Sequence, residues 1–297
     1  MGGLATALLV AACGSSAGSA GSSGAAAGGL LVVATTTQLA DFTRVVGGDR
    51  VTTYGLLKPN LDAHEYEPSP GDIDRIRRAG VVVRNGLGLD GWVDKAIKAS
   101  GTKAAVVTAS AGLTPRAEDG EPDPHVWMDP RNAKVMVADI AAALGTADPA
   151  GATGYDQRRD GYLTQLDALD AEIDAALSPL ANRKVVTNHD AFHYFLDRYR
   201  LTFVGSVIPS FDTQAELSAA ELKDLVDRIR AAGVTVIFTE SSLPPKTART
   251  IADEAGVRVV GGDGALYGDS LGPPGSGADT YLTMMRKNTR TFADNLR

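Results

Sequence analysis

The sequence predicts an α/β fold of two lobes, in which parallel sheets flanked by helices are joined by one long connecting helix. Three observations support this fold class: short apolar runs rich in valine recur along the chain, helical patterns lie between them, and one long helical pattern lies at mid-chain. Near-continuous apolar runs of this length are typical of parallel strands buried on both faces. Alternation of such strands with helices favours an α/β architecture.

The composition is that of an ordinary globular protein. Of 297 residues, 44% are hydrophobic and 22% are charged, which excludes collagen-like, fully disordered and polytopic membrane classes. The net charge of −7, the lack of a Lys/Arg-rich run and the aromatic content of 6% argue against nucleic acid as a partner. Cys13 is the only cysteine, so neither an internal disulfide nor a cysteine-rich zinc finger is expected.

Residues 1–13 are predicted to be a signal peptide that ends in a lipid-acceptor cysteine. The apolar run Leu4–Ala12 is shorter than the ~18–20 residues of a membrane-spanning helix and fits the h-region of a secretory signal. The letters VAACG around Cys13 resemble a bacterial lipobox, although no Lys or Arg precedes the apolar run. We therefore expect an extracytoplasmic protein that is lipid-anchored to the membrane through Cys13.

Residues 14–29 read GSSAGSAGSSGAAAGG and are predicted to be a flexible tether. A run of Gly, Ser and Ala has no large apolar side chains to bury. Its root-mean-square reach is roughly 20–24 Å by the flexible-linker rule. The tether would connect the membrane anchor to the folded body.

The strands and helices of the body follow from local patterns. Apolar runs predict eight strands, at Leu30–Thr35, Val51–Leu57, Val81–Arg84, Ala104–Thr108, Lys184–Thr187, Leu201–Val207, Val234–Thr239 and Val257–Val260. Apolar residues at helical spacing predict helices over Asp72–Ala79 and Glu216–Ala232. The strands divide into one group before residue 150 and a second group after residue 180.

A long helix is predicted between the two groups of strands, from about Tyr155 to Leu177. Tyr162, Leu166, Leu169, Ile173, Ala176 and Leu177 keep helical spacing there. Such a helix would be roughly 37 Å long, the height of a domain. We interpret it as a connector (151–180) between an N-terminal lobe (30–150) and a C-terminal lobe (181–297). The alternative is an ordinary core helix of one lobe.

Three of the four histidines follow predicted strands. His64 lies in a loop after one strand, His125 lies in a proline-flanked loop, and His189 ends a strand in the second half. Open α/β sheets bind ligands beyond the carboxyl ends of their strands, so a metal site in a cleft between the lobes is expected. Neutral imidazole is a common zinc ligand, and a tetrahedral site needs one more ligand. Glu240, Asp263 and Asp269 are candidates for that position, and spacing alone does not choose among them. His193 is a rival because it lies four residues after His189, a spacing that can place two zinc ligands on one helix face.

At these residues the chain resembles the metal-binding lipoproteins of bacterial zinc and manganese ABC importers, the cluster A-I solute-binding proteins. The resemblance covers nearly everything after the tether. It is carried by the segments VVATTTQLADFTRVVGGDRV, DAHEYEPSP, DPHVWMDPRNA, VVTNHDAFHYFLDRY, YGDSL and ADTYLTMMRKN. The family implies two α/β lobes joined by one long rigid helix, with a single metal ion held between them.

Carried over position by position, the resemblance implies four metal ligands: His64, His125, His189 and Asp269. It disfavours Asp263 and His193. Manganese-type members tend to carry Glu at the position of His189, and three imidazoles with one carboxylate suit zinc better than manganese. The implied cargo is one Zn²⁺ ion.

The resemblance implies a binding protein rather than an enzyme. Its expected function is extracytoplasmic capture of Zn²⁺ and delivery to the membrane permease of an ABC importer. A zinc metallochaperone is a further candidate partner, and nothing in the sequence suggests an obligate dimer, so a monomer is expected. The stretch Thr114–Asp123 departs from many zinc-type members because it is short, acidic and without histidine. We interpret it as a solvated acidic turn.

Four other functions are alternatives to zinc import. Manganese binding is one. A metal-stabilised surface adhesin is the second, because some members of the family have been described as adhesins. Binding of a chelated metal or siderophore is the third, and it would need an open cleft lined by arginine or aromatic residues. A zinc hydrolase is disfavoured because the H-E-x-x-H signature fails after His64-Glu65.

Overall fold

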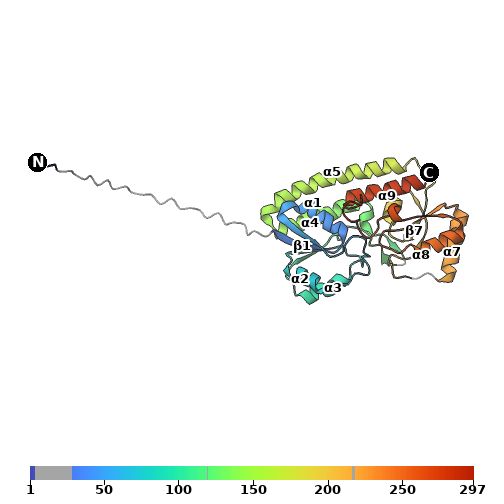
Figure 1. Ribbon diagram of the computed structural model, residues 1–297, viewed down its shortest axis with the longest axis horizontal. Coiled ribbons are helices and arrows are strands. Elements are labelled where there is room, and N and C mark those ends of the chain that lie inside the picture. Colours follow the sequence, from blue (N-terminus) through green and yellow to red (C-terminus); the bar gives the residue numbers. More distant parts are fainter. Residues whose placement is uncertain (4–28, 119, 216–217) are drawn as a thin grey trace.

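The protein consists of two α/β lobes that lie side by side beneath one long helix (Figure 1). This computed structural model describes residues 1–3, 29–118, 120–215 and 218–297. Cys13 and nearly all of the predicted signal and tether lie outside the described residues. Among the described residues, no helix is both long and apolar enough to cross a membrane.

Each lobe is built on a four-stranded parallel sheet. The strand order is β2-β1-β3-β4 in the first sheet and β10-β9-β7-β8 in the second. The strands of the two sheets are β1 Leu30–Ala34, β2 Val51–Gly55, β3 Val81–Arg84 and β4 Ala105–Thr108, then β7 Lys184–His189, β8 Thr202–Ile208, β9 Val236–Phe238 and β10 Arg258–Val260. All eight predicted strands are confirmed, each within two residues of its expected bounds.

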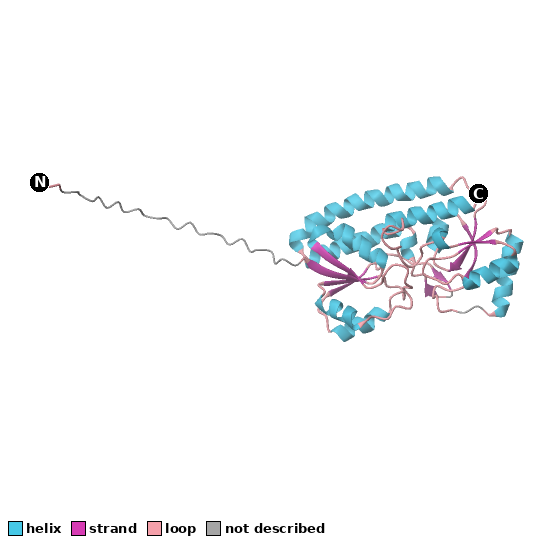
Figure 2. Cartoon of the chain, in the orientation of Figure 1, coloured by secondary structure: helices cyan, strands magenta, loops and turns pink. Residues whose placement is uncertain are grey.

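The two sheets share one topology. In each, the first strand of the lobe lies between the second and the third, and the fourth strand lies beyond the third. Because all pairs are parallel, the carboxyl ends of a sheet share one edge. Figure 2 shows that loops gather between the two sheets, in the middle of the molecule. The loops that follow the strands of the two lobes therefore meet in the region where the sequence predicts the metal site.

The helices cover both sheets. They are α1 Thr37–Gly47, α2 Pro70–Arg78, α3 Trp92–Ser100, α4 Pro130–Ala147, α6 His193–Arg198, α7 Ala219–Ala232, α8 Lys246–Ala255 and α9 Tyr281–Asn295. A small hairpin, β5 Ala117–Glu118 and β6 Glu121–Pro122, lies before α4. The two shorter predicted helices are confirmed as α2 and α7. Each begins after a serine in a capping box, Ser69 and Ser218, which satisfies free amides of the first turn.

The connecting helix is α5, Ala152–Leu177, with 26 residues. At 1.5 Å per residue it is about 39 Å long, and Figure 1 shows it running along both lobes. It packs against α1, α4 and α9. Of the predicted apolar stripe, five residues are buried and Ala176 is exposed, so the packed face is narrower than expected. The helix begins three residues before Tyr155.

A second element, α9, also connects the lobes. At its start, Tyr281 N donates to Asp41 Oδ2 of α1 at 2.8 Å, and Tyr281 Oη donates to the carbonyl of Trp127 at 2.6 Å. Towards its end, the Phe292 ring packs against Phe238 of the second sheet, with ring centroids 4.9 Å apart. The largest hydrophobic cluster accordingly contains residues of both lobes. The domain boundaries at 150 and 180 stay a prediction.

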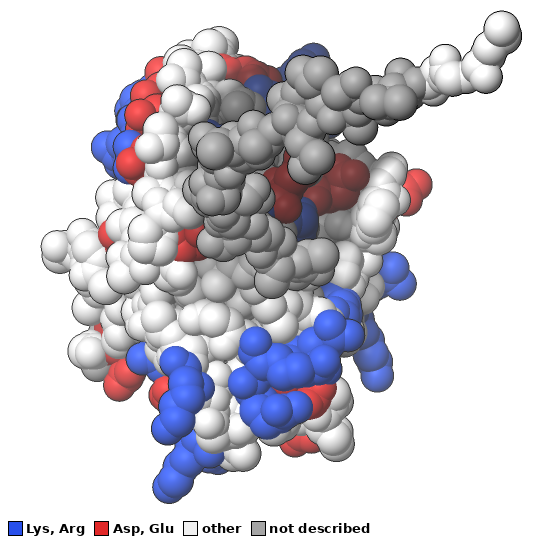
Figure 3. Space-filling model, turned by 90° about the vertical axis from the view of Figure 1, so that its left-hand side faces the viewer, with Lys and Arg blue, Asp and Glu red and all other residues white. Residues whose placement is uncertain are grey.

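The charge of the surface is uneven. The last turn of α2 contains Arg75, Arg77 and Arg78. Figure 3, which views the left-hand end of Figure 1, shows Lys and Arg side chains gathered on its lower part, where α2 and α3 lie in Figure 1. The net charge of −7 therefore coexists with a locally basic end of the first lobe.

Candidate metal centre

Four side chains that are far apart in the sequence meet between the lobes. These are His64, His125, His189 and Asp269, and each offers one ligand atom such that all four atoms lie within 4.8 Å of one another. The Asp269 carboxylate is central. Its Oδ2 lies 3.6 Å from His64 Nε2 and 4.0 Å from His189 Nε2, and its Oδ1 lies 3.4 Å from His125 Nε2.

Both lobes supply the four residues, one of them from a strand and three from loops. His64 follows β2, and its backbone amide donates to Asp62 Oδ1 at 2.9 Å. His125 precedes a short 3-10 turn, Val126–Met128, that leads into α4. His189 is the last residue of β7. Asp269 follows a parallel bridge between Glu240 and Leu266, which continues the second sheet beyond β9.

The ligand atoms are buried and unsatisfied. Within the described part of the chain, the Nε2 atoms of the three histidines and both carboxylate oxygens of Asp269 have no hydrogen-bond partner. His125, His189 and Asp269 are fully buried, and the side chain of His64 is 8% exposed. Buried polar atoms are normally paired, because an unpaired one costs several kcal/mol. Five such atoms aimed at one point fit a bound cation.

Two carboxylates orient the imidazoles of His125 and His189 by contacting the ring nitrogen that faces away from the centre. His125 Nδ1 lies 2.8 Å from Asp123 Oδ1, and His189 Nδ1 lies 2.9 Å from Glu240 Oε1. A proton on Nδ1 leaves the lone pair of Nε2 free to face the metal. The sequence offered Glu240 as a possible fourth ligand, and the structure places its carboxylate against Nδ1 of His189 instead. Asp123 was not singled out in the sequence, although it lies only two residues before His125. Its Oδ1 also accepts from the backbone amide of His125 at 3.0 Å.

The loop that carries Asp269 is attached to the first lobe. The carbonyl of Gly268 accepts from Gln38 Nε2 and from Trp127 Nε1, each at 3.2 Å. The amide of Leu271 donates to Thr37 Oγ1 at 2.7 Å. These bonds join segments more than 140 residues apart in the sequence. They fix Asp269 opposite the histidines of the first lobe.

The histidines and carboxylates of the centre shift one another's pKa values. Burial alone would lower the pKa of His125, but Asp123 and Asp269 outweigh it and raise that pKa to about 10. Burial raises the pKa of Asp269, yet the three histidines outweigh burial and hold it well below its usual value. Burial lowers the pKa of His64, and the other two imidazoles add to that effect. Asp123 and Asp269 therefore favour the protonated form of His125 when no metal is bound.

The other sequence candidates lie elsewhere. Asp263 is exposed in the turn Gly262–Gly264, so it is not part of the cluster. His193 opens α6 and contacts Asp190, with 2.6 Å between Nε2 and Oδ1, and it does not face the centre. Asp190, the residue after His189, therefore pairs with His193.

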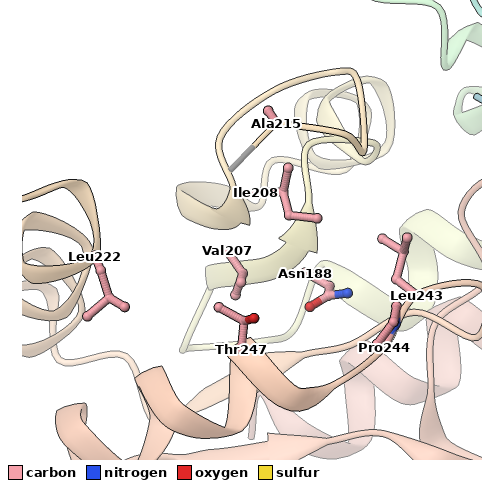
Figure 4. A pocket seen from close by; sticks show the side chains of 8 residues that line it. All are labelled: Asn188, Val207, Ile208, Ala215, Leu222, Leu243, Pro244 and Thr247. Atoms are coloured by element: carbon pink, nitrogen blue, oxygen red, sulfur yellow. The ribbon is translucent and has the colours of Figure 1, made fainter. Parts of the chain in front are cut away.

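A separate pocket lies next to β7. It measures about 330 Å³ and is lined by Asn188, Val207, Ile208, Ala215, Leu222, Leu243, Pro244 and Thr247. Figure 4 shows the Asn188 side chain among these mostly apolar groups. Neighbouring residues of a strand point to opposite faces, so His189 is directed away from this pocket. Among the described residues, the lining of this pocket contains none of the four residues of the metal centre.

Comparison with known proteins places this geometry in a family. Residues 32–295 match the family described as "Zinc-uptake complex component A periplasmic". The chain belongs to this family. It is therefore an extracytoplasmic solute-binding protein of the kind that serves ABC-type metal uptake, and not an enzyme.

Individual relatives of this solute-binding protein carry different metals in their names. The iron-binding protein YfeA of Yersinia pestis is 30% identical over 263 residues, covering 86% of this chain and 83% of YfeA. The manganese-binding lipoprotein MntA of Halalkalibacterium halodurans is 29% identical over 261 residues, covering 87% and 85%. The periplasmic zinc-binding protein TroA of Treponema pallidum superposes with a TM-score of 0.84 at 29% identity, covering 91% of this chain and 99% of TroA. Family membership therefore establishes metal binding and leaves the choice of metal open.

Proposed function

We propose that this solute-binding protein captures one Zn²⁺ ion outside the cytoplasm and delivers it to the permease of an ABC importer. The observation that carries the proposal is the set of five buried, unsatisfied ligand atoms on His64, His125, His189 and Asp269. Three imidazole nitrogens and one carboxylate match the ligand preference of zinc, whereas manganese favours more oxygen ligands. TroA, named as a zinc-binding protein, supports the same choice.

Four protein ligands also suit transport better than catalysis. A catalytic zinc keeps one position open for water or substrate, and a structural or carried zinc does not need one. Because the loop of Asp269 is hydrogen-bonded to the first lobe, release of the ion requires those bonds or the ligand loops to move. Docking on a permease is the event proposed to cause that movement.

Metal competition tests the choice of ion and the ligands together. The purified protein is stripped with a chelator, offered equal Zn²⁺ and Mn²⁺, and its bound metal is measured by mass spectrometry. One zinc and little manganese are expected for the wild type, with loss of tight zinc in His189→Ala. His193→Ala is the matched control and should keep the tight zinc. Preferred manganese would contradict the choice of ion, and retention of tight zinc by His189→Ala would contradict the ligand set.

Delivery and anchoring are tested in cells. We propose that Cys13 carries the lipid anchor and that residues 14–29 tether the body to the membrane. A strain that lacks the gene should grow poorly in zinc-depleted medium. The wild-type gene should restore growth, His189→Ala should not, and Cys13→Ala should move the protein from the membrane fraction to the soluble fraction. Unchanged zinc uptake with altered attachment to surfaces would favour an adhesin instead.

A further inference from the structure

The first lobe carries a group of exposed basic side chains on α2, on α3 and just before β4. Figure 3 shows Lys and Arg gathered on the lower part of this lobe, where α2 and α3 lie in Figure 1. We call the six exposed residues of this group the basic face: Arg75, Arg77, Arg78, Lys95, Lys98 and Lys103.

The carboxylates of the same stretch offset only part of this charge. Residues 70–103 contain four acidic side chains. Asp72 and Asp90 are buried, and Asp94 pairs with Arg84, which is not part of the basic face. Asp74 is shared by two arginines, those of positions 77 and 78, whose side chains are still 57% and 52% exposed. The basic face therefore keeps a net positive charge.

The opposite side of the molecule is acidic. The long helix α5 contains six acidic and two basic side chains. In Figure 1, α5 runs along the top of the molecule, whereas α2 and α3 lie at the bottom of the first lobe. The net charge of −7 is therefore unevenly distributed, and an anionic surface would attract the basic face and repel α5.

The basic face also lies where the chain enters the first lobe. The amide of Gly80 donates to the carbonyl of Leu31 at 2.9 Å, and the amide of Ala105 donates to the carbonyl of Gly80 at 3.0 Å. These bonds place Arg78 and Lys103, each two residues away, at the edge of the sheet where β1 begins. The predicted tether, with a reach of roughly 20–24 Å, would therefore bring this end of the molecule to the membrane.

A groove with aromatic side chains lies between α2 and α3, beside the basic face. It measures about 390 Å³, and its lining includes Tyr66, Ile73 and the partly buried Trp92. The rings of Tyr66 and Trp92 are in contact, with centroids 4.9 Å apart. Lys95 and Glu67 are its charged lining residues. Tryptophan and tyrosine are enriched at membrane–water interfaces, because part of each side chain is apolar and part is polar.

We propose that the basic face and the groove beside it form a surface that binds the anionic phospholipids of the membrane. Lipid phosphate groups complement the arginines and lysines, and Trp92 fits the boundary between headgroups and acyl chains. The proposal rests on the proposed lipid anchor of Cys13, which brings the membrane within reach. The contact would hold the folded body against the membrane with α5 turned outwards, whereas the tether alone would leave its orientation free.

Vesicle binding by a chain without lipid tests the proposal. The chain from residue 13, carrying Cys13→Ala, is mixed with vesicles of phosphatidylcholine, either alone or with an equal part of phosphatidylglycerol, and bound protein is measured by co-sedimentation. Binding is expected only with phosphatidylglycerol. It should fall steeply between about 0.1 M and about 1 M salt, because the screening length falls from about 10 Å to about 3 Å.

Tryptophan fluorescence shows whether the groove takes part. The chain has two tryptophans, and Trp127 is 1% exposed, so a change on binding reports Trp92. The emission should shift to shorter wavelength when phosphatidylglycerol vesicles are added, and Trp92→Phe should remove the shift. An unchanged emission in a chain that binds the vesicles would overturn the role of the groove.

Two triple variants with the same change of charge locate the contact. The test variant combines Lys95→Glu, Lys98→Glu and Lys103→Glu. The control combines Lys184→Glu, Lys223→Glu and Lys246→Glu, three exposed lysines of the second lobe. The test variant should bind the vesicles at least about tenfold more weakly, because each basic residue near an anionic membrane contributes to attraction. The control should stay within about twofold of the wild type, because its charges lie beyond the screening length. Both variants should keep tight zinc, which shows that they fold.

The outcomes separate this proposal from the main function. Absence of binding to phosphatidylglycerol vesicles would overturn it, as would equal binding to phosphatidylcholine alone or an equal loss in both triple variants. If the wild type ignores the vesicles but the test variant impairs zinc uptake in cells, the basic face contacts a protein such as the permease instead. Failure of the wild type to bind zinc would overturn the proposed function and leave the vesicle result unaffected.

Discussion

Replacement of Glu240 by glutamine isolates the effect of a group that touches a ligand and not the metal. Glu240 is 3% exposed, and its Oε1 holds His189 Nδ1 at 2.9 Å. Its Oε2 has no hydrogen-bond partner among the described residues. Glu240→Gln keeps the size of the side chain and removes the negative charge, so His189 Nδ1 loses its charged hydrogen-bond acceptor and the imidazole becomes a less basic ligand.

The expected loss follows from that single contact. Changes to such supporting groups typically cost 10–100-fold in metal affinity, which is about 1.4–2.7 kcal/mol. At a free zinc concentration of about 1,000 times the wild-type Kd, binding stabilises the protein by about 4.1 kcal/mol. A roughly 30-fold weaker variant would gain only about 2.1 kcal/mol under the same conditions. The rise in Tm caused by zinc should therefore be about half that of the wild type.

Competition with a chromophoric chelator gives the affinities, and thermal unfolding with and without zinc gives the stabilisation. Asp41→Asn is the control, because Asp41 is a buried carboxylate that bonds Arg44 and Tyr281 outside the centre. It should lower the Tm of the metal-free protein without changing the zinc affinity. Equal affinity in Glu240→Gln and wild type would refute the role assigned to Glu240, and equal losses in both variants would show a general effect on folding.

Three further predictions concern other parts of the structure. Gly268→Ala should weaken zinc binding about tenfold or more, because an added Cβ would lie 2.0 Å from the buried Oε2 of Glu240 and displace that side chain; unchanged binding would contradict this. The pKa of His125 is raised to about 10 in the metal-free protein, so a proton on this imidazole must be released to the buffer when zinc binds. Calorimetry in buffers of different ionisation enthalpy should therefore show proton release, with affinity falling as the pH is lowered; affinity that is independent of pH would argue against it. Phe292→Ala should cost about 3–5 kcal/mol of stability in chemical denaturation and leave zinc affinity within about twofold, because its ring packs in the core of the second lobe.

The strands were predictable because their signal is local. Runs such as Val81–Arg84 are apolar on both faces, which a parallel strand covered by helices requires. The expectation that His64, His125 and His189 meet in space followed from a general rule, which is that open α/β sheets bind ligands beyond the carboxyl ends of their strands. In the same way, the length of α5 could be inferred from an apolar spacing that continues through Gly161.

The choice of the fourth ligand was not predictable from spacing. Glu240, Asp263 and Asp269 all follow strands of the second lobe, and only the resemblance to metal-binding lipoproteins favoured Asp269. The structure separates them through contacts between distant segments. Glu240 bonds to His189, Asp263 faces solvent, and Asp269 is held against the first lobe by the bonds of Gly268.

The sequence also did not predict the role of Asp123. Asp123 lies in an acidic stretch that predicts a solvated turn, yet it is fully buried behind His125. Tyr194 of α6 also holds this segment, because its hydroxyl donates to the carbonyl of Asp123 at 3.0 Å. Glu118, in the same stretch, is exposed but lies beside His193.

The sequence by itself determined the fold class, the eight strands and the long helix, because each depends on residues that are neighbours in the chain. It also indicated three histidines in loops or at strand ends as candidate metal ligands. Only the tertiary structure decided which carboxylate faces the histidines and which ones orient them. It also decided that His193 pairs with Asp190 outside the centre. The physical reason is that hydrogen bonding and burial of these groups depend on contacts across the two lobes, between segments as far apart as Gln38 and Gly268.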